Sequence, residues 1–322
     1  MRLLSGGIIT NYRCNAACGH CLYGSSPTAE AGYMTEETAQ QICTFLRANG
    51  CQSVHIGGGE PFLQTDKLAA VVRVVLKSGL ALDYIETNAG WITHNAEQNR
   101  KRLQQVLDAG AECLMVSADP FHIAYVPMYK PLALIRLLRE MGLPHFVWKD
   151  KYINEMRALD PERTYNRAEL AEALGYDAVR ACTKEYGLGF NGRALNLLPE
   201  FGEPRPMESY LTNEPCAALS DTSHFHIDYL GRYVPPRCTG MGIALADWGK
   251  PLNREDYPVM QRLLTGGIEA LAAFARAQGF VPTPEGYWSR CALCVALRKH
   301  ISISQTAPCR DLTPAAFYRQ DY

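Results

Sequence analysis

Strand-like and helix-like runs alternate along the N-terminal part of the chain, and this order constrains the fold more than any other feature. Each short apolar run is followed by a longer amphipathic run that ends near a glycine. In such an order, each helix connects one strand to the next strand, which runs parallel to it. The alternation therefore predicts a parallel sheet covered by helices. The predicted strands are residues 3–9, 53–56, 82–86, 113–117, 145–149 and 178–183, and the predicted helices are 35–49, 66–77, 95–109, 131–141 and 167–174.

Four polar motifs lie just beyond the carboxyl ends of the first four predicted strands. They are RCNAACGHC (13–21), GGGEP (57–61), ETNAG (86–90) and SADPFH (117–122). In α/β barrels, the loops at this edge converge to build the active site. The sequence therefore predicts an α/β fold, a partial (β/α)6 barrel of the TIM type, in which the four motifs form one site.

The first motif holds three cysteines, Cys14, Cys18 and Cys21, with Cys-x3-Cys-x2-Cys spacing. Iron–sulfur clusters of four irons are usually held by four cysteines. Three thiolates on one loop would leave one iron open for a further ligand, and hence for chemistry. Zinc is the alternative, although structural zinc has four closed ligands and usually paired Cys-x2-Cys segments.

Over about residues 8–200, these motifs together resemble the radical S-adenosylmethionine (radical SAM) enzymes. The resemblance implies that the three cysteines hold a [4Fe-4S] cluster and that S-adenosylmethionine (SAM) binds its open iron. His20 occupies the position that packs near the adenine in that family. The residues implied to contact SAM are His20, Gly58, Gly59, Glu60, Thr87, Asn88 and Ser117.

Some of these residues have ordinary structural interpretations. Thr87 and Asn88 are also common turn formers, and Ser117 can simply end a strand. Asp119 and His122 face the same edge and would either touch substrate or be solvated. No residue is assigned as a catalytic acid, base or thiol.

Four further cysteines, Cys216, Cys238, Cys291 and Cys294, lie in the C-terminal third. The first two bracket a predicted hairpin with Gly231 at its turn. With the preceding GFNGRA (189–194), this order resembles the auxiliary-cluster extension called SPASM, in its shortened "twitch" form. The resemblance implies a second, fully ligated [4Fe-4S] cluster, and a structural zinc site is the alternative.

The cysteine pattern departs from a full SPASM extension, which has seven cysteines and two clusters. Only Cys309 follows Cys294, and it would be a spare ligand, a catalytic thiol or a loop residue. We expect two domains, a radical SAM partial barrel at residues 1–205 and a small cysteine-rich auxiliary-cluster domain at 206–322. Cys43, Cys51, Cys113 and Cys182 stand in apolar contexts and are expected to be buried.

Composition narrows the class of protein. Of 322 residues, 47% are hydrophobic and the net charge is -1, so no charge pattern points to nucleic acid or to an anionic membrane. No apolar run is long enough to span a bilayer. Twelve cysteines without an export signal indicate metal ligands or buried thiols in a reducing cytoplasm.

The resemblance implies an enzyme that reductively cleaves SAM to a 5′-deoxyadenosyl radical, abstracts a substrate hydrogen and oxidatively modifies a peptide or small metabolite. An external electron donor of the flavodoxin or ferredoxin type would reduce the cluster. Thirteen residues precede Cys14, so a peptide substrate would need a separate recognition partner. The alternatives are a redox-neutral isomerase or lyase with a structural auxiliary cluster, and a non-enzymatic electron carrier or regulator.

His224, His226 and Asp228 alternate, so on a strand they would share one face. That face would be a polar, solvated or substrate-facing surface, or a metal site.

Overall fold

A mostly parallel eight-stranded sheet forms the centre of the protein in the computed structural model, which describes residues 2–186, 190–304 and 309–319. The strand order is β5-β4-β3-β2-β1-β6-β7-β8; the strands from β5 to β6 are parallel, and β7 and β8 are antiparallel. The bounds are β1 Ser5–Ile9, β2 Ser53–Gly57, β3 Ala81–Thr87, β4 Leu114–Ser117, β5 His145–Trp148, β6 His224–Asp228, β7 Arg232–Val234 and β8 Ile243–Ala244. The predicted α/β class and partial barrel are confirmed.

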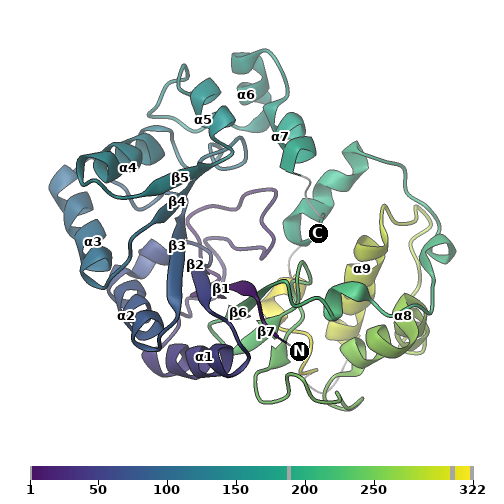
Figure 1. The fold of residues 1–322 in the computed structure, drawn as a ribbon. Helices are drawn as coiled ribbons and strands as arrows, with labels where there is room; N and C mark the ends of the chain where they lie inside the picture. The colour runs from purple at the N-terminus through teal and green to yellow at the C-terminus, as the bar shows by residue number, and fades with distance from the viewer. Residues whose placement is uncertain (1, 187–189, 305–308, 320–322) are drawn as a thin grey trace.

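Helices that connect the first strands cover one face of the sheet, as Figure 1 shows for α1 to α4 on the left of the view. Their apolar sides form the core, and Thr35 and Asn95 cap the first turns of α1 and α3. The helices are α1 Glu36–Ala48, α2 Thr65–Lys77, α3 Ala96–Asp108, α4 Tyr129–Glu140, α5 Asp150–Met156, α6 Arg167–Leu174, α7 Ala178–Tyr186, α8 Pro258–Arg276 and α9 Arg290–Ser304. None of the described helices has both the length and the apolar character needed to cross a membrane.

The predicted sixth strand at residues 178–183 is wrong, because this segment forms the helix α7. Its buried residues are Ala178, Val179, Cys182 and Thr183. Residues at this spacing lie on one side of a helix, whereas on a strand they would lie on both faces. The sixth parallel strand is instead β6, which pairs with β1 in register from Ser5↔His224 to Ile9↔Asp228.

The predicted hairpin is confirmed: β6 and β7 pair antiparallel, and Gly231 has φ +69 in the turn. Through β6 the central sheet continues past residue 205, where the sequence predicts a domain boundary. The division at this residue stays a prediction. Structurally, the C-terminal part supplies one wall of the barrel.

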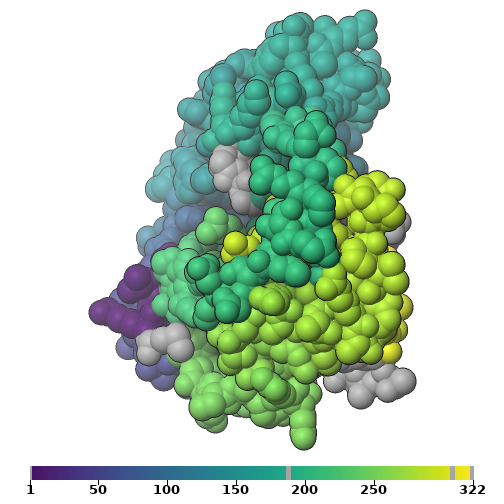
Figure 2. Space-filling view, turned by 90° about the vertical axis from the view of Figure 1, so that its right-hand side faces the viewer, coloured from purple at the N-terminus to yellow at the C-terminus, as the bar shows by residue number. Residues whose placement is uncertain are grey.

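The C-terminal helices α8 and α9 lie beside this sheet, on the right of Figure 1, and pack against each other. The carboxylate of Asp311 accepts hydrogen bonds from the amides of Val259 and Met260 and so caps the start of α8. In Figure 2, the green-to-yellow C-terminal residues and the preceding teal residues meet on the face turned to the viewer.

Candidate functional site

A cavity of about 500 Å³ lies at the carboxyl edge of the parallel strands. All four motifs contribute to its lining, as their positions after successive strands predict. The predicted site residues that line it are Cys14, Cys18, His20, Cys21, Gly58, Gly59, Thr87, Asn88 and Ser117. Glu60 is not among the described residues that line it.

The Arg193 side chain binds the backbone of the cysteine loop. Its guanidinium donates hydrogen bonds to the carbonyl oxygens of Cys18 (2.8 Å), Gly24 (2.8 Å) and Ser25 (2.9 Å). Gly192 has φ +58, and a Cβ there would lie 2.1 Å from the carbonyl oxygen of Leu22. The segment after α7 therefore packs directly against the loop, although Gly189, the first residue of GFNGRA, lies outside the described residues.

The glycine run 57–59 packs against the start of the same loop through backbone hydrogen bonds. The amide of Gly59 donates to Asn11 O (2.8 Å) and that of Glu60 to Arg13 O (3.0 Å). A Cβ on Gly59 would lie 2.0 Å from the carbonyl oxygen of Arg13. Glycine is thus required here because two backbone segments are in contact.

Cys14 is buried with two donors directed at its sulfur. The backbone amide of Ala16 and the side-chain amide of Asn88 each lie 3.4 Å from Cys14 Sγ. Burial raises the pKa of this thiol, so a ligand that accepts a thiolate is needed to keep it ionised. The two donors and the neighbouring thiols Cys18 and Cys21 fit a cluster bound through sulfur.

Glu60 is fully buried and connects two motifs. One carboxylate oxygen accepts from Thr87 Oγ1 (2.9 Å) and Phe62 N (3.0 Å), and the other from Asn88 N (2.8 Å). Burial raises the pKa of Glu60 to about 7, against the opposing effect of these hydrogen bonds. The resemblance implies that Glu60 contacts SAM, and that role stays a prediction. In the structure, its carboxylate connects the segments that follow β2 and β3.

His20 lines the cavity and stacks on Phe121, with ring centroids 4.4 Å apart. Burial lowers the pKa of His20 to about 4. Asp119 is fully buried and binds His122 Nδ1 at 2.8 Å. Burial alone would lower the pKa of His122, but the Asp119 carboxylate and Cys18 raise it well above its usual value.

The hydroxyls of Tyr23 and Ser25 are buried and lack a hydrogen-bond partner among the described residues. Both residues line the cavity. Buried polar groups are normally hydrogen-bonded, so these two hydroxyls indicate that a polar ligand is expected in the cavity.

Further lining residues were not singled out from the sequence: His55, Tyr84, Met115 and Trp148, together with Glu86, named only as part of its motif. Burial raises the pKa of Glu86 to about 7. Tyr84 and Glu86 alternate on β3, and this inward-facing alternation is the signal that would have identified them once the strand had been assigned.

The four C-terminal cysteines Cys216, Cys238, Cys291 and Cys294 line a second cavity, of about 400 Å³. Cys291 and Cys294 lie three residues apart in the first turns of α9, so they share one side of it.

The buried side chain of Arg298, one turn further along α9, also lines the second cavity. Its positive charge opposes the increase in pKa that burial causes for Cys291 and Cys294. Cys216 and Cys238 share a hydrogen bond that lowers the pKa of Cys216 and raises that of Cys238. The second cavity therefore fits a bound group that takes several thiolates.

Cys309 is not among the described residues that line the second cavity. Its thiol donates to Asp311 Oδ1 at 2.7 Å, next to the cap of α8. Cys43, Cys51 and Cys182 are fully buried as expected, and Cys113 is half-buried.

Residues 8–154 match the sequence model of the Radical SAM superfamily. This stretch contains the three cysteines of the first motif, the end of β1 and the strands β2 to β5. In sequence, the N-terminal part of the chain is therefore similar to the radical SAM superfamily over residues 8–154.

Two curated proteins are similar to parts of this chain. YydG of Bacillus subtilis (strain 168), whose name refers to peptide biosynthesis, is 25% identical over 153 residues, which are 45% of this chain and 46% of YydG. The GTP 3',8-cyclase of Rhizobium leguminosarum bv. trifolii (strain WSM2304) is 25% identical over 108 residues, 33% of this chain and 30% of the cyclase. The matches thus span less than half of each relative.

Solved structures are also similar. The anSMEcpe structure with bound AdoMet is 16% identical, covers 98% of this chain and 94% of its own, and has a TM-score of 0.42. The SuiB structure from Streptococcus suis with bound S-adenosylmethionine is 14% identical, covers 91% of this chain and 77% of its own, and has a TM-score of 0.38.

Proposed function

We propose that this chain is a radical SAM enzyme that cleaves SAM reductively and oxidatively modifies a peptide or a small metabolite. The observation that carries the proposal is one cavity, lined by the three motif cysteines and by the ends of β2, β3 and β4. The match of residues 8–154 to the radical SAM superfamily supports it.

Cys14, Cys18 and Cys21 would hold a [4Fe-4S] cluster, with SAM bound along Gly58, Gly59, Thr87, Asn88 and Ser117 and its adenine near His20. When bound, the cluster and SAM supply a 5′-deoxyadenosyl radical that removes a hydrogen atom from the substrate. The chain's own contribution is to position these groups and exclude water. Asn88 donates to Cys14 Sγ, and Glu60 fixes Asn88 through its amide.

The second cavity supports an auxiliary cluster on Cys216, Cys238, Cys291 and Cys294. Such a cluster would accept the electron that a substrate radical must lose in an oxidation. A structural zinc ion on the same thiolates is the alternative. Iron counting on the anaerobically reconstituted chain separates the two: about eight irons support two clusters, whereas about four, retained in Cys291→Ala, contradict the auxiliary one.

A peptide substrate is favoured over a small metabolite because the similar protein YydG is named for peptide biosynthesis. A separate partner would present the peptide, and a flavodoxin- or ferredoxin-type protein in the cytoplasm would supply electrons. Neighbouring genes that encode a short precursor peptide would favour this assignment.

The direct test is to incubate the reduced chain with SAM under anaerobic conditions and measure 5′-deoxyadenosine and methionine. Release of both, lost in Cys18→Ala, is the expected result. Failure with an intact cluster would favour an electron carrier or regulator. With substrate, a product lighter by two hydrogens indicates oxidation, and an isomeric or cleaved product of unchanged redox state indicates an isomerase or lyase.

A further inference from the structure

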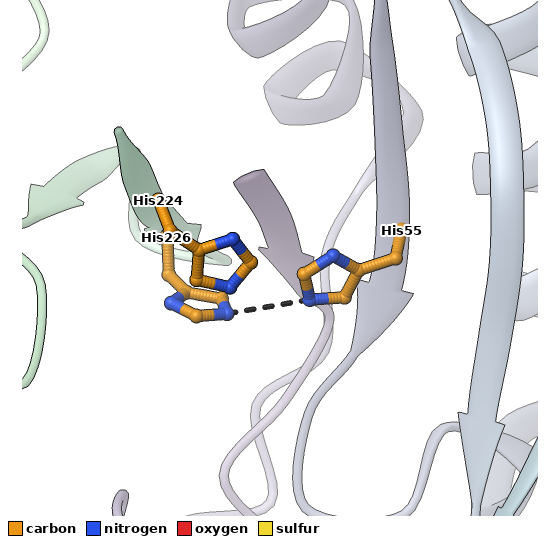
Figure 3. A group of neighbouring side chains, drawn as sticks. All are labelled: His55, His224 and His226. Atoms are coloured by element: carbon orange, nitrogen blue, oxygen red, sulfur yellow. Dashed lines mark hydrogen bonds between the residues drawn. The ribbon is translucent and has the colours of Figure 1, made fainter. Parts of the chain in front are cut away.

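Three histidines from two strands converge on the inner face of the sheet, outside the four motifs. His55 projects from β2, and His224 and His226 project from β6 (Figure 3). One ring nitrogen of each lies within 4.8 Å of those of the other two. His55 is buried, His226 is partly buried and His224 is exposed.

Gly7 of the intervening strand β1 makes this meeting possible. Gly7 pairs in register with His55 on one side and with His226 on the other. The side chains of His55 and His226 therefore lie on the same face of the sheet, and so does that of His224, two residues before His226. A Cβ on Gly7 would lie 2.3 Å from His55 Nε2 and 2.6 Å from His226 Cδ2. Because Gly7 has no side chain, the two imidazoles occupy the space above β1 and meet there.

The spacing of the two rings suits a shared cation. His55 Nε2 and His226 Nε2 lie 3.3 Å apart and share the hydrogen bond that the dashed line in Figure 3 marks. Two imidazole nitrogens on one tetrahedral zinc ion, each at about 2.0–2.1 Å, are separated by about 3.3–3.4 Å. The hydrogen bond requires a proton on one of the two Nε2 atoms. When an ion binds, that histidine would change tautomer, so that both Nε2 atoms direct a lone pair at the ion and both protons lie on Nδ1.

Aromatic neighbours fix the directions of the rings. Tyr84 stacks on His55 with centroids 5.1 Å apart, and Tyr23 meets the ring of His226 edge-on at 5.4 Å. His224 stacks on the other side of His55 at 5.4 Å and, being exposed, has room to turn toward an ion. Glu86 Oε1 lies 3.6 Å from His55 Nε2, which places a carboxylate beside the three nitrogens.

We propose that His55, His224 and His226 bind a divalent transition-metal ion of the kind that imidazole favours, such as Zn²⁺. Sites with three protein ligands keep a further coordination position open, and all three histidines line the cavity that also contains Cys14, Cys18 and Cys21. The open position would hold an oxygen or nitrogen atom of the substrate; this last step rests on the proposed function, whereas metal binding does not.

The test uses the full chain with its iron sites reconstituted, incubated with Zn²⁺ in the absence of SAM and substrate. Zinc-edge X-ray absorption is expected to show nitrogen and oxygen neighbours at about 2.0–2.1 Å with imidazole scattering. Zinc found with sulfur neighbours alone would overturn the proposal, because the thiolates rather than the histidines would then be its ligands.

Substitutions locate the ion. His226→Gln is expected to weaken Zn²⁺ binding by more than about tenfold, since even loss of an outer-shell partner costs about 10–100-fold. Gly7→Ala should weaken it similarly without removing a ligand, because the Cβ displaces both rings. Equal zinc affinity in the original chain and in His226→Gln would refute the site.

His94→Gln is the matched control. His94 is exposed in the loop between β3 and α3, does not line the cavity of the three histidines, and among the ion pairs found in the described residues it pairs only with Glu162. Iron content and thermal unfolding check that each variant folds. If His226→Gln does not fold, His224→Gln provides the same test at an exposed position. Zinc affinity and 5′-deoxyadenosine release are separate measurements, so failure of one does not imply failure of the other.

Discussion

The guanidinium of Arg193 lies 2.8 Å from the carbonyl oxygen of Cys18, although the two residues are 175 positions apart in the sequence. This contact joins the segment after α7 to the loop that contains all three motif cysteines. The shape of the loop therefore depends on a residue outside the stretch that matches the radical SAM superfamily.

Arg193→Ala should destabilise the chain by about 2–4 kcal/mol, because three carbonyl oxygens lose a charged donor. Urea unfolding of the full chain measures the change. Arg163→Ala, which removes an exposed ion pair with Glu169, is the control and should change stability by less than about 1 kcal/mol. Equal effects of the two substitutions would argue against a structural role for Arg193.

Gly59→Ala should destabilise the chain by about 2–4 kcal/mol. The added Cβ would lie 2.0 Å from the Arg13 carbonyl oxygen, and relieving this clash requires the backbone itself to move. Gly202→Ala is the matched control, because no atom lies within 4 Å of its Cβ position. It should be neutral or slightly stabilising. Thermal unfolding of the two variants side by side tests the expectation.

Glu60 should make stability depend on pH. Burial raises the pKa of this carboxyl group to about 7, so on raising the pH the unfolded chain releases the proton first. The free energy of unfolding should therefore fall between about pH 4.5 and pH 7, with Glu60 contributing up to about 1.4 kcal/mol per pH unit.

Glu60→Gln removes this contribution and should make the pH profile measured by urea unfolding less steep, whereas Glu86, whose pKa burial also raises to about 7, keeps its own contribution. The same substitution at exposed Glu37, on the surface of α1, provides the comparison. A profile that keeps its slope in Glu60→Gln would assign the pH dependence to other groups.

Residues 1–205 expressed alone should fail to form a stable monomer. Without β6, the edge of β1 is left unpaired, and exposed strand edges promote association. Size-exclusion chromatography and circular dichroism would show aggregation or loss of structure. A well-folded monomer would mean that the predicted boundary separates independent domains.

Local patterns were sufficient for the strands β1 to β5 and for the motifs at their ends. The prediction was wrong at residues 178–183, where apolar residues at helical spacing were interpreted as a strand. Periodicity in a short segment does not distinguish the two. Pairing of β6 with β1 was not predictable, because nothing local to His224–Asp228 identifies a partner so far away in the sequence.

The same limit applies within the site. The spacing of Cys14, Cys18 and Cys21 identified the cysteine loop, whereas Arg193 became visible only as a contact in space. The three histidines also needed the structure. His224 and His226 alternate visibly, but His55 joins them only because Gly7 leaves room between two flanking strands.

The pairing of β1 with β6 also affects when the barrel can be completed during folding. Tyr12 OH donates to Asp228 Oδ2 at 2.9 Å across 216 residues, so this contact waits until most of the chain has been synthesised. Contacts between residues far apart in the sequence form late and slow folding. On the ribosome, the barrel therefore stays incomplete at the edge of β1, next to the cysteine loop, until β6 has been synthesised.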